Sequence, residues 1–327
     1  MENIYQLNQL RFYYNDKPAL SLDNIQLQAG KTTALIGANG SGKSTLLNML
    51  AFLTSPAQGE ILFNGQRVNK KGLVRYRRRV GFLAQKPFML LGTVYDNIDL
   101  ALKIQGKGRR SEKIIRVLKQ LDIERCIYQQ AKLLSGGELQ KVALARSLVL
   151  EPEVLLLDEP FSYLDQSSAQ ALETFLQGYT QETGHTLIFS THNRLQGFAL
   201  ADKVLALADG LEVKTPLINL FHGEVEGHQF HSGSMSIVLS EAITTGRHAS
   251  INPKDIVLSN GALESSMRNH FQGRIIMIAD EMGSVRVSVD TGVVFKALIT
   301  YQALEELKLN LGGEVWVNFK SSAVVVF

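Results

Sequence analysis

Residues 37–45, GANGSGKST, constrain the fold of this 327-residue chain more than any other feature. They match G-x-x-x-x-G-K-[ST], the pattern of the loop that cradles phosphates in nucleoside-triphosphate enzymes. Residues 32–36 read as the end of a buried strand before the loop, and residues 45–50 as a helix after it. The backbone N–H groups of such a loop and the positive end of its helix both favour an anion. The segment therefore predicts a triphosphate site between a strand and a helix.

Individual positions in this loop have distinct expected roles. Gly37, Gly40 and Gly42 let the backbone turn tightly, because no side chain obstructs it. Lys43 is expected to reach the β- and γ-phosphates, and the Ser44 hydroxyl to bind Mg²⁺. A glycine-rich loop with a chance lysine is the alternative, and the correct placing of strand, loop and helix disfavours it. The remaining loop positions expected to bind the nucleotide are Ala38, Asn39, Ser41 and Thr45.

Three further segments follow in a fixed order: LSGGELQ at residues 134–140, VLLLDEP at 154–160 and STH at 190–192. The apolar run of the second ends in two adjacent carboxylates, Asp158 and Glu159. This pattern is expected of a buried strand that delivers a Mg²⁺ ligand and a base to one site. A solvated pair of acids at a strand end is the alternative. The order of all four segments favours the functional interpretation.

In this order the segments resemble the ATP-binding cassette (ABC) ATPases, of which LSGGE is the signature. The resemblance covers about the first two-thirds of the chain. It implies ATP as the nucleotide and Mg²⁺ as the cofactor. It also implies that Asp158 organises Mg²⁺, that Glu159 is the general base polarising the attacking water, and that His192 contacts the γ-phosphate. A satisfied histidine after an apolar strand is the alternative for His192.

The same resemblance implies roles for three residues outside these segments. Tyr14 in RFYYNDKPAL matches the aromatic that stacks on adenine, with neighbouring Tyr13 as the alternative. Gln85 in GFLAQKP matches a glutamine that senses Mg²⁺ and contacts the membrane partner, although it could be an ordinary turn residue. Asp165 in SYLD matches the loop that crosses to the other subunit.

The signature segment also predicts assembly. Ser135, Gly136 and Gly137 open a helix and form a second anion-binding terminus. In the family this terminus caps the γ-phosphate that the opposite subunit holds. Because the chain carries each motif once, the resemblance implies a head-to-tail homodimer that shares two ATP molecules. Glu138 stands where many relatives carry Gln, and little effect on the chemistry is expected.

Composition favours a soluble protein without nucleic-acid partners. The net charge is +3, the mean hydropathy is near zero, and no apolar run approaches 18 residues. The first residues are polar, which gives no indication of a signal peptide. The single cysteine, Cys126, suits a reducing cytosol and is expected to pack in a helix. The expected location is the cytoplasmic face of the plasma membrane, as a peripheral protein.

Two domains are expected. Residues 1–221 read as an α/β ABC ATPase domain, a P-loop fold with a largely parallel sheet. Its helical subdomain is expected at about residues 86–150, which would meet the membrane partner. One apolar helix face is predicted there, made of Ile114, Ile115, Val117, Leu118 and Leu121.

Residues 222–327 read as a small all-β barrel of the oligonucleotide/oligosaccharide-binding (OB) type. Alternating runs, SVRVSV at 284–289 and EVWVNF at 314–319, are separated by turn signals. The pattern resembles the accessory (TOBE) barrel of many ABC import ATPases. Residues 265–275 resemble the opening strand of a molybdate-binding (MOP-type) barrel, and residues 318–326 its closing strand. Two stretches, INPKDIVLS and VNFKSSAVVV, also look alike.

A tetrahedral oxyanion needs hydroxyls, amides and one or two cations as partners. The resemblance places such groups in the barrel, and the alternative is that they face solvent while the barrel serves as a dimer contact. Met267 replaces the small residue common in relatives. The candidate oxyanion residues are Ser265, Ser266, Arg268, Asn269, Lys320 and Ser321.

The sequence therefore predicts the ATP-hydrolysing subunit of an importer for molybdate- or tungstate-type oxyanions. Its expected partners are a second copy, a membrane permease that docks near residues 85–97, and indirectly an extracytoplasmic substrate-binding protein. An importer ATPase for a sugar, polyamine or iron is the main alternative. A non-transport ABC ATPase is disfavoured, because a long coiled-coil insertion is absent and the motifs occur once.

Overall fold

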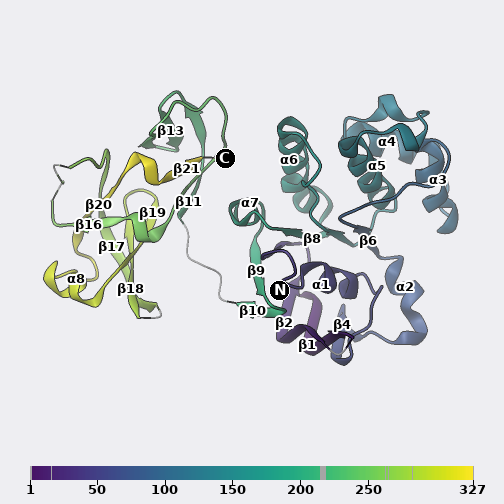
Figure 1. Ribbon diagram of the computed structural model, residues 1–327, viewed down its shortest axis with the longest axis horizontal. Coiled ribbons are helices and arrows are strands. Elements are labelled where there is room, and N and C mark those ends of the chain that lie inside the picture. The colour runs from purple at the N-terminus through teal and green to yellow at the C-terminus, as the bar shows by residue number, and fades with distance from the viewer. Residues whose placement is uncertain are drawn as a thin grey trace. The chain divides into compact units, whose positions relative to one another are not determined.

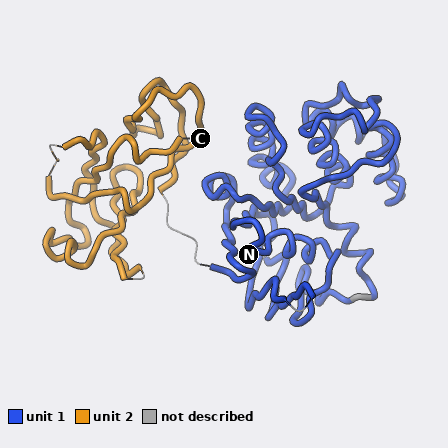
Figure 2. Tube along the Cα trace, viewed as in Figure 1, with its two compact units in different colours: residues 1–215 blue, residues 216–327 orange. Residues whose placement is uncertain are grey.

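The computed structural model describes residues 2–15, 17–213, 219–261, 263, 265–281 and 283–326. The chain divides into two compact units, residues 1–215 and 216–327 (Figure 2). The division precedes the expected boundary after residue 221, because β11 (Asn219–His222) pairs with β15 (His248–Ile251) inside the second unit. No helix in the described part of the chain is both long and apolar enough to cross a membrane.

The first unit is built on one ten-stranded sheet in the order β5-β4-β1-β2-β10-β9-β3-β8-β7-β6 (Figure 1). The strands from β9 to β6 in this order run parallel to one another, whereas β1, β2, β4 and β5 pair antiparallel. The parallel part confirms the expected α/β class. The strands are β1 (Asn3–Tyr14), β2 (Lys17–Gln28), β3 (Thr32–Ile36), β4 (Gln58–Phe63), β5 (Gln66–Arg67), β6 (Val80–Leu83), β7 (Val154–Leu157), β8 (Thr186–Thr191), β9 (Lys203–Ala208) and β10 (Leu211–Val213).

The central parallel strands β3, β7 and β8 are buried on both faces, which explains why they read as nearly continuous apolar runs. Successive side chains of a strand point to opposite faces. In β7, Leu155 and Leu157 join the apolar cluster on one face, and Val154 and Leu156 join the cluster on the other. The P-loop helix packs into the second cluster. Residues of the helices after residue 93 pack into the first.

The helices of the first unit are α1 (Lys43–Leu50), α2 (Leu73–Arg77), α3 (Val94–Ile104), α4 (Arg110–Gln120), α5 (Gly136–Leu148), α6 (Gln166–Thr183) and α7 (Arg194–Leu200), with 3₁₀ turns at Lys70–Gly72, Glu124–Cys126 and Ala131–Leu133. In Figure 1, α3, α4 and α5 form a helical group. The expected apolar face of α4 is wrong at one position. Ile115 is 42% exposed, because it lies off the i, i+3, i+4 stripe that Ile114, Val117 and Leu118 bury.

The second unit holds three antiparallel sheets, β11-β15-β21, β12-β13-β14 and β16-β20-β17-β18-β19. Phe271, Phe295 and Phe319 stack in its core, with ring centroids 5.5–5.9 Å apart. Further elements are β12 (Glu224–Glu226), β13 (Gln229–Ser232), β14 (Met235–Val238), β16 (Val257–Ser259), β17 (Asn269–Glu281), β18 (Ser284–Asp290), β19 (Val294–Ile299), α8 (Tyr301–Glu306), β20 (Glu314–Phe319) and β21 (Val324–Val326), with 3₁₀ turns at Pro253–Asp255 and Ser321–Ala323.

The two look-alike stretches of the second unit pair with each other crosswise. Each is a strand, a 3₁₀ turn and a strand, and β15 pairs with β21 while β16 pairs with β20. Residues 318–326 are therefore not one closing strand, because the turn at Ser321–Ala323 sends β20 and β21 into different sheets. The expected opening strand likewise begins only at Asn269.

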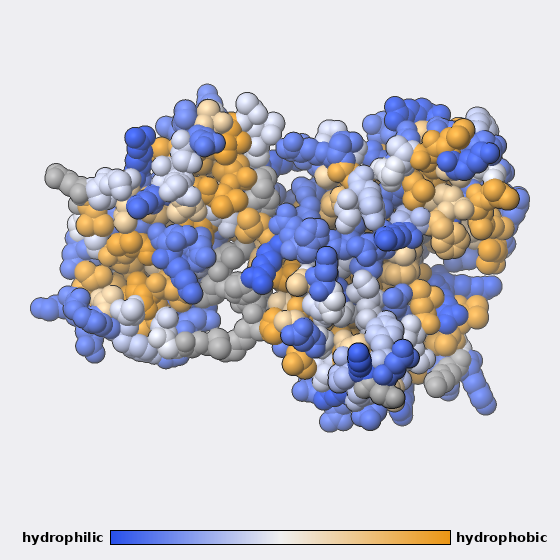
Figure 3. Space-filling model, in the orientation of Figure 1, coloured by the Kyte–Doolittle hydropathy of each residue, from blue (hydrophilic) through white to orange (hydrophobic). Residues whose placement is uncertain are grey.

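The surface in view is mixed. Figure 3 shows hydrophilic side chains over much of both units, with apolar groups between them. Among the exposed apolar residues of the first unit are Phe88, Leu91 and Ile104, with exposed fractions of 69%, 95% and 68%. Phe88 and Leu91 lie between β6 and α3, where the sequence predicts the permease contact.

Candidate functional site

The P-loop leaves β3 and enters α1, as the sequence predicts. Gly37 cannot carry a side chain, because a Cβ there would lie 2.3 Å from the backbone oxygen of Leu207 and 2.5 Å from Ser41 Oγ. Gly42 caps α1 at φ 100°, a left-handed conformation that favours glycine. Gly40 has φ 82° and nothing within 4 Å of its Cβ position, so its backbone borders open space.

Lys43 lies at the base of this loop. Its side chain is buried, and Nζ donates to the carbonyl oxygens of Gly37 at 2.8 Å and Ala38 at 3.0 Å. The same nitrogen lies 3.8 Å from Glu159 Oε1. Burial lowers the pKa of Lys43 from its ordinary value, while the carboxylates of Glu159 and Asp158 oppose that effect. A buried cation thus contacts both the P-loop backbone and the Glu159 carboxylate.

These groups border one cavity of about 680 Å³, which we call the nucleotide cavity. Small-molecule sites typically occupy roughly 300–1,000 Å³, so the volume suits a nucleotide. Gly37, Ala38, Asp158 and His192 are not among its lining residues. The predicted residues that line it are Tyr14, Asn39, Gly40, Ser41, Gly42, Lys43, Ser44, Thr45, Gln85 and Glu159.

Tyr14, rather than Tyr13, borders the nucleotide cavity. The Tyr14 side chain is 56% exposed, and its hydroxyl lies 3.4 Å from Thr45 Oγ1. The ring meets Phe12 edge-on, with centroids 4.8 Å apart. The exposure of this ring beside the nucleotide cavity suits stacking by a planar ring.

Two carboxylates follow β7 and are held by a buried serine of β8. Ser190 Oγ donates to Asp158 Oδ1 at 2.6 Å and accepts from the Glu159 backbone N–H at 2.8 Å. His192 Nδ1 lies 2.9 Å from Glu159 Oε2. Glu159 has φ 49°, an uncommon conformation for a residue with a side chain. Sequence patterns indicated no role for Ser190. Its position as the fifth residue of β8, directly after three apolar residues and before Thr191 and His192, was the available signal.

The expected Mg²⁺ ligands have the right chemistry for a hard cation, since Ser44, Gln85 and Asp158 offer hydroxyl, amide and carboxylate oxygens. Ser44 and Gln85 line the nucleotide cavity. Two buried oxygens nearby, Ser41 Oγ and Glu159 Oε1, have no hydrogen-bond partner. Unsatisfied buried polar atoms are rare in folded proteins, so these two fit a site that a charged ligand completes.

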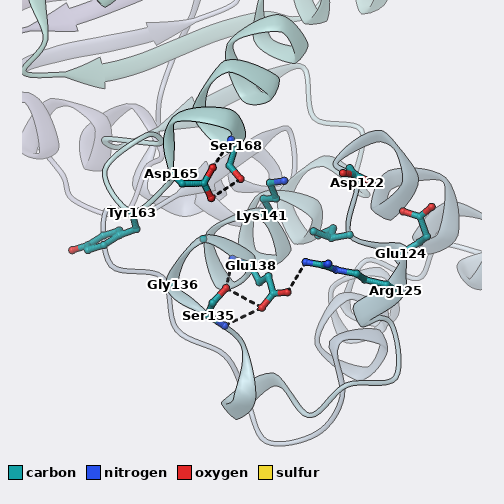
Figure 4. Close-up of a pocket in the computed structure, with 12 residues that line it drawn as sticks. Asp122, Glu124, Arg125, Ser135, Gly136, Glu138, Lys141, Tyr163, Asp165 and Ser168 are labelled. Carbon is teal, nitrogen blue, oxygen red and sulfur yellow. Dashed lines mark hydrogen bonds and ion pairs between the residues drawn. The ribbon is translucent and has the colours of Figure 1, made fainter.

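The signature segment borders a different cavity, of about 690 Å³, which we call the signature cavity (Figure 4). Ser135 caps α5, and Glu138 closes a capping box with it. Asp165 caps α6 and accepts from Ser167 Oγ and from the backbone N–H of Ser168. These hydrogen bonds lower the pKa of Asp165 to about 2. Ser135, Gly136, Gly137 and Asp165 all line this cavity, and none of them lines the nucleotide cavity.

The oxyanion candidates of the second unit divide into two groups. Asn269 is buried and does not fit the expected set, because its side chain accepts from the Val238 backbone N–H at 2.7 Å and donates to the Val238 carbonyl at 3.0 Å. It joins β17 to β14 instead. Because Asn269 pairs with Phe319, Arg268 and Lys320 lie at the same end of two paired strands. The exposed candidates are Ser265, Ser266, Arg268 and Lys320, and Ser321 is partly buried.

Family comparisons agree with both units. Residues 20–162 match the family described as "ABC transporter", and residues 265–326 match "TOBE domain". The molybdate/tungstate import ATP-binding protein WtpC of Pyrococcus abyssi is 32% identical over 319 residues, covering 90% of this chain and 91% of the relative. The sulfate/thiosulfate import ATP-binding protein CysA 1 of Agrobacterium fabrum is 34% identical, covering 74% of this chain and 77% of the relative.

Solved structures resemble the first unit. The CbiO1 protein of Clostridium perfringens, part of an ABC transporter complex, aligns with a TM-score of 0.60 and 29% identity, covering 65% of this chain and 88% of that one. A dimeric ATP-binding cassette, MJ0796, bound to ADP and Pi, aligns with a TM-score of 0.59 and 27% identity, covering 64% of this chain and 97% of that one. The chain therefore belongs to the ABC transporter family, as an ATP-binding protein and ATPase of the import type that carries a C-terminal TOBE domain.

Proposed function

We propose that two copies of this chain form the pair of ATP-hydrolysing subunits of an importer for molybdate- or tungstate-type oxyanions. The observation that carries the proposal is the separation of two half-sites on one chain. Lys43 and Glu159 border the nucleotide cavity, while Ser135 and Gly137 border the signature cavity. A head-to-tail homodimer brings each half-site of one copy to the complementary half-site of the other.

Within one nucleotide cavity, each residue has a defined task in this proposal. Tyr14 stacks on adenine, and Lys43 with the P-loop N–H groups binds the β- and γ-phosphates. Ser44, Gln85 and Asp158 would hold Mg²⁺, which would supply positive charge against the triphosphate. Glu159 polarises a water whose oxygen attacks the γ-phosphorus, the bond to the β–γ bridging oxygen breaks, and ADP and phosphate result.

The remaining residues complete and close the site. His192, 2.9 Å from Glu159, contacts the γ-phosphate. Ser135, Gly136 and Gly137 of one copy cap the γ-phosphate bound to the other, and Asp165 contributes at the same junction. Closure removes bulk water, which strengthens the electrostatic interactions at the γ-phosphate.

The permease contact is proposed at the exposed apolar segment after Gln85. Phe88 and Leu91 are exposed, and the Arg146 guanidinium lies over the Phe88 ring at 5.6 Å and bonds the Phe88 carbonyl. Because Gln85 lines the nucleotide cavity, this segment connects the nucleotide to the surface. The chain would work at the cytoplasmic face of the plasma membrane, with a permease supplied by an extracytoplasmic substrate-binding protein.

The substrate class rests on the named relatives. Two relatives that cover 90% and 93% of this chain are molybdate/tungstate import proteins, whereas the sulfate/thiosulfate relatives cover 61–76%. Arg268 and Lys320, with nearby serine hydroxyls, remain our candidates for oxyanion binding in the TOBE unit. Calorimetric titration of the full chain with tungstate, molybdate and sulfate tests this. Heat with tungstate that is lost in the double variant Arg268→Gln/Lys320→Gln supports oxyanion binding in this unit, and no heat with any of the three anions refutes it.

The shared site is tested with Glu159→Gln. This variant keeps the nucleotide contacts but lacks the base, so it should lose turnover and accumulate as an ATP-bound dimer in sedimentation velocity. Lys43→Ala in the same background should remain monomeric, because the triphosphate that joins the copies is not held. A Glu159→Gln protein that stays monomeric at saturating ATP would refute the shared site.

A further inference from the structure

The carboxylate of Glu138 connects the signature segment to a second element. Its Oε2 accepts from the Ser135 backbone N–H at 3.1 Å and lies 2.9 Å from Ser135 Oγ. Its Oε1 accepts from an Arg125 guanidinium nitrogen at 3.0 Å (Figure 4) and from Cys126 Sγ at 3.5 Å. The Ser135 backbone hydrogen bond is the main cause that holds the pKa of Glu138 below its ordinary value. Both oxygens of a charged carboxylate are therefore engaged.

This arrangement uses the single proton of the Ser135 hydroxyl. An ionised carboxylate can only accept hydrogen bonds, so Ser135 Oγ donates its single proton to Glu138. The hydroxyl also accepts from the Glu138 backbone N–H at 3.3 Å. While this pair holds, Ser135 has no proton to give to a phosphate oxygen. A glutamine at this position could donate through its amide and would not impose the same constraint.

The charges around the signature cavity also oppose the binding of a phosphate. Four of its lining side chains are acidic and two are basic, so acids outnumber bases where a triphosphate is expected. Asp165 keeps its charge, because its pKa is about 2. The acidic residues are Asp122, Glu124, Glu138 and Asp165, and the basic ones are Arg125 and Lys141. Of the two basic residues, Arg125 is the one that pairs with Glu138, within 3.0 Å.

We propose that Arg125 is a positioning residue for ATP-driven pairing, which balances the charge of Glu138 from the carboxylate oxygen that Ser135 does not use. This inference rests on the proposed shared site. By neutralising Glu138, the Arg125 guanidinium weakens the hold of this carboxylate on the Ser135 proton and lowers its repulsion of the γ-phosphate that the opposite copy holds. Without Arg125, Glu138 holds the Ser135 proton more tightly and repels the phosphate. Glu138 therefore suits the signature role better in company with Arg125.

The geometry also sets the expected size of the effect. The Arg125 side chain is 77% exposed, and that of Glu138 is 22% exposed. Exposed ion pairs have modest energies, so loss of Arg125 should weaken pairing about two- to fivefold rather than abolish it. Salt screens exposed charges over roughly 8–10 Å, so the difference should shrink as ionic strength rises.

The experiment measures the ATP concentration that half-dimerises the Glu159→Gln protein, at low and high salt. Arg125→Gln should raise this concentration about two- to fivefold at low salt. Arg125→Lys should restore most of the difference, because the charge returns. Adding Glu138→Gln to Arg125→Gln should restore pairing as well, because the carboxylate that needed balancing is gone. Lys119→Gln, an exposed lysine of α4 outside the signature cavity, is the matched loss of one positive charge.

Two outcomes would overturn the inference while leaving the shared site intact. One is an Arg125→Gln protein that pairs like Lys119→Gln; the other is a double variant as weak as Arg125→Gln alone, which would mean that Arg125 acts without Glu138. Failure of the Glu159→Gln parent to dimerise at all would instead count against the proposed function. Circular dichroism and denaturant midpoints identify any variant that is merely misfolded.

Discussion

Replacing Ser190 with alanine tests whether one buried hydroxyl holds both carboxylates of the candidate site. Ser190 is fully buried, and its Oγ is the partner of both Asp158 Oδ1 and the Glu159 backbone N–H. Alanine fits the space but leaves one charged acceptor and one backbone donor with a lost hydrogen bond. The substitution changes no residue that is expected to touch the nucleotide.

The structure sets the expected magnitudes. A hydrogen bond to a charged group contributes about 1.5–3 kcal/mol, and an unsatisfied buried donor costs about 1–3 kcal/mol. Because some relaxation is expected, Ser190→Ala should lower the free energy of unfolding by about 2–4 kcal/mol. A misplacement near 1 Å can reduce a rate roughly a hundredfold. We therefore expect kcat to fall about 10- to 100-fold, with KM for ATP nearly unchanged.

The assay combines steady-state ATP hydrolysis with urea unfolding, and Ser147→Ala is the matched control. Ser147 of α5 is also buried. Its hydroxyl donates to the Phe82 carbonyl of β6 at 3.0 Å and has no hydrogen bond to either carboxylate. That variant should lose about 1 kcal/mol of stability and keep its kcat. If Ser190→Ala loses stability but hydrolyses ATP as Ser147→Ala does, the reasoning that Ser190 positions the carboxylates is wrong.

Two further predictions concern backbone and pH. Gly210→Ala should destabilise the chain by at least about 2 kcal/mol more than Gly184→Ala in denaturant unfolding. Both glycines have positive φ, but only at Gly210 would a Cβ meet a backbone oxygen, that of Ala19, at 2.5 Å. Equal losses of stability in the two variants would contradict the steric argument. Burial lowers the pKa of His248 from 6.5 to about 4, so the folded state favours the neutral imidazole ring. The stability that the neutral ring contributes is present above pH 6.5 and is lost as the pH falls toward 4. Urea midpoints followed by fluorescence of the single tryptophan, Trp316 in β20, should fall less across that window in His248→Gln, and an equal fall in both proteins would refute the assignment.

The P-loop part of the fold was predictable because its information is local. Glycines, an apolar run and a following amphipathic run lie consecutively, so β3, the loop and α1 are read directly from residues 32–50. The alternation at 284–289 and 314–319 predicted β18 and β20 for the same reason, and the α/β and antiparallel β classes are confirmed.

Two of the three wrong predictions depend on contacts between distant residues, and the third on the helix period. Ile115 looked apolar enough for the core of α4, yet the helix period turns it outward. Asn269 looked like an anion ligand, but a backbone partner at Val238 uses its amide. The pairing of β15 with β21 bends residues 318–326 into two strands, which no property of that stretch alone indicates.

Ser190 and Arg125 were missed for a related reason. The partners of Ser190 are Asp158 and Glu159, which directly follow β7 and lie more than thirty residues away along the chain. Arg125 acts through a glutamate that follows it by thirteen residues, across a turn. Sequence patterns identify such residues only when a motif is already attached to them.

The left-handed backbone at Glu159 has a consequence for how this protein can evolve. A side-chain-bearing residue at φ 49° costs about 1 kcal/mol or more relative to glycine, and the surrounding β7 and β8 contacts absorb that cost. Selection for thermal stability alone would favour glycine or asparagine at this position. Glutamate at this position therefore lowers the free energy of unfolding somewhat, and in return the fold presents a carboxylate in a fixed orientation.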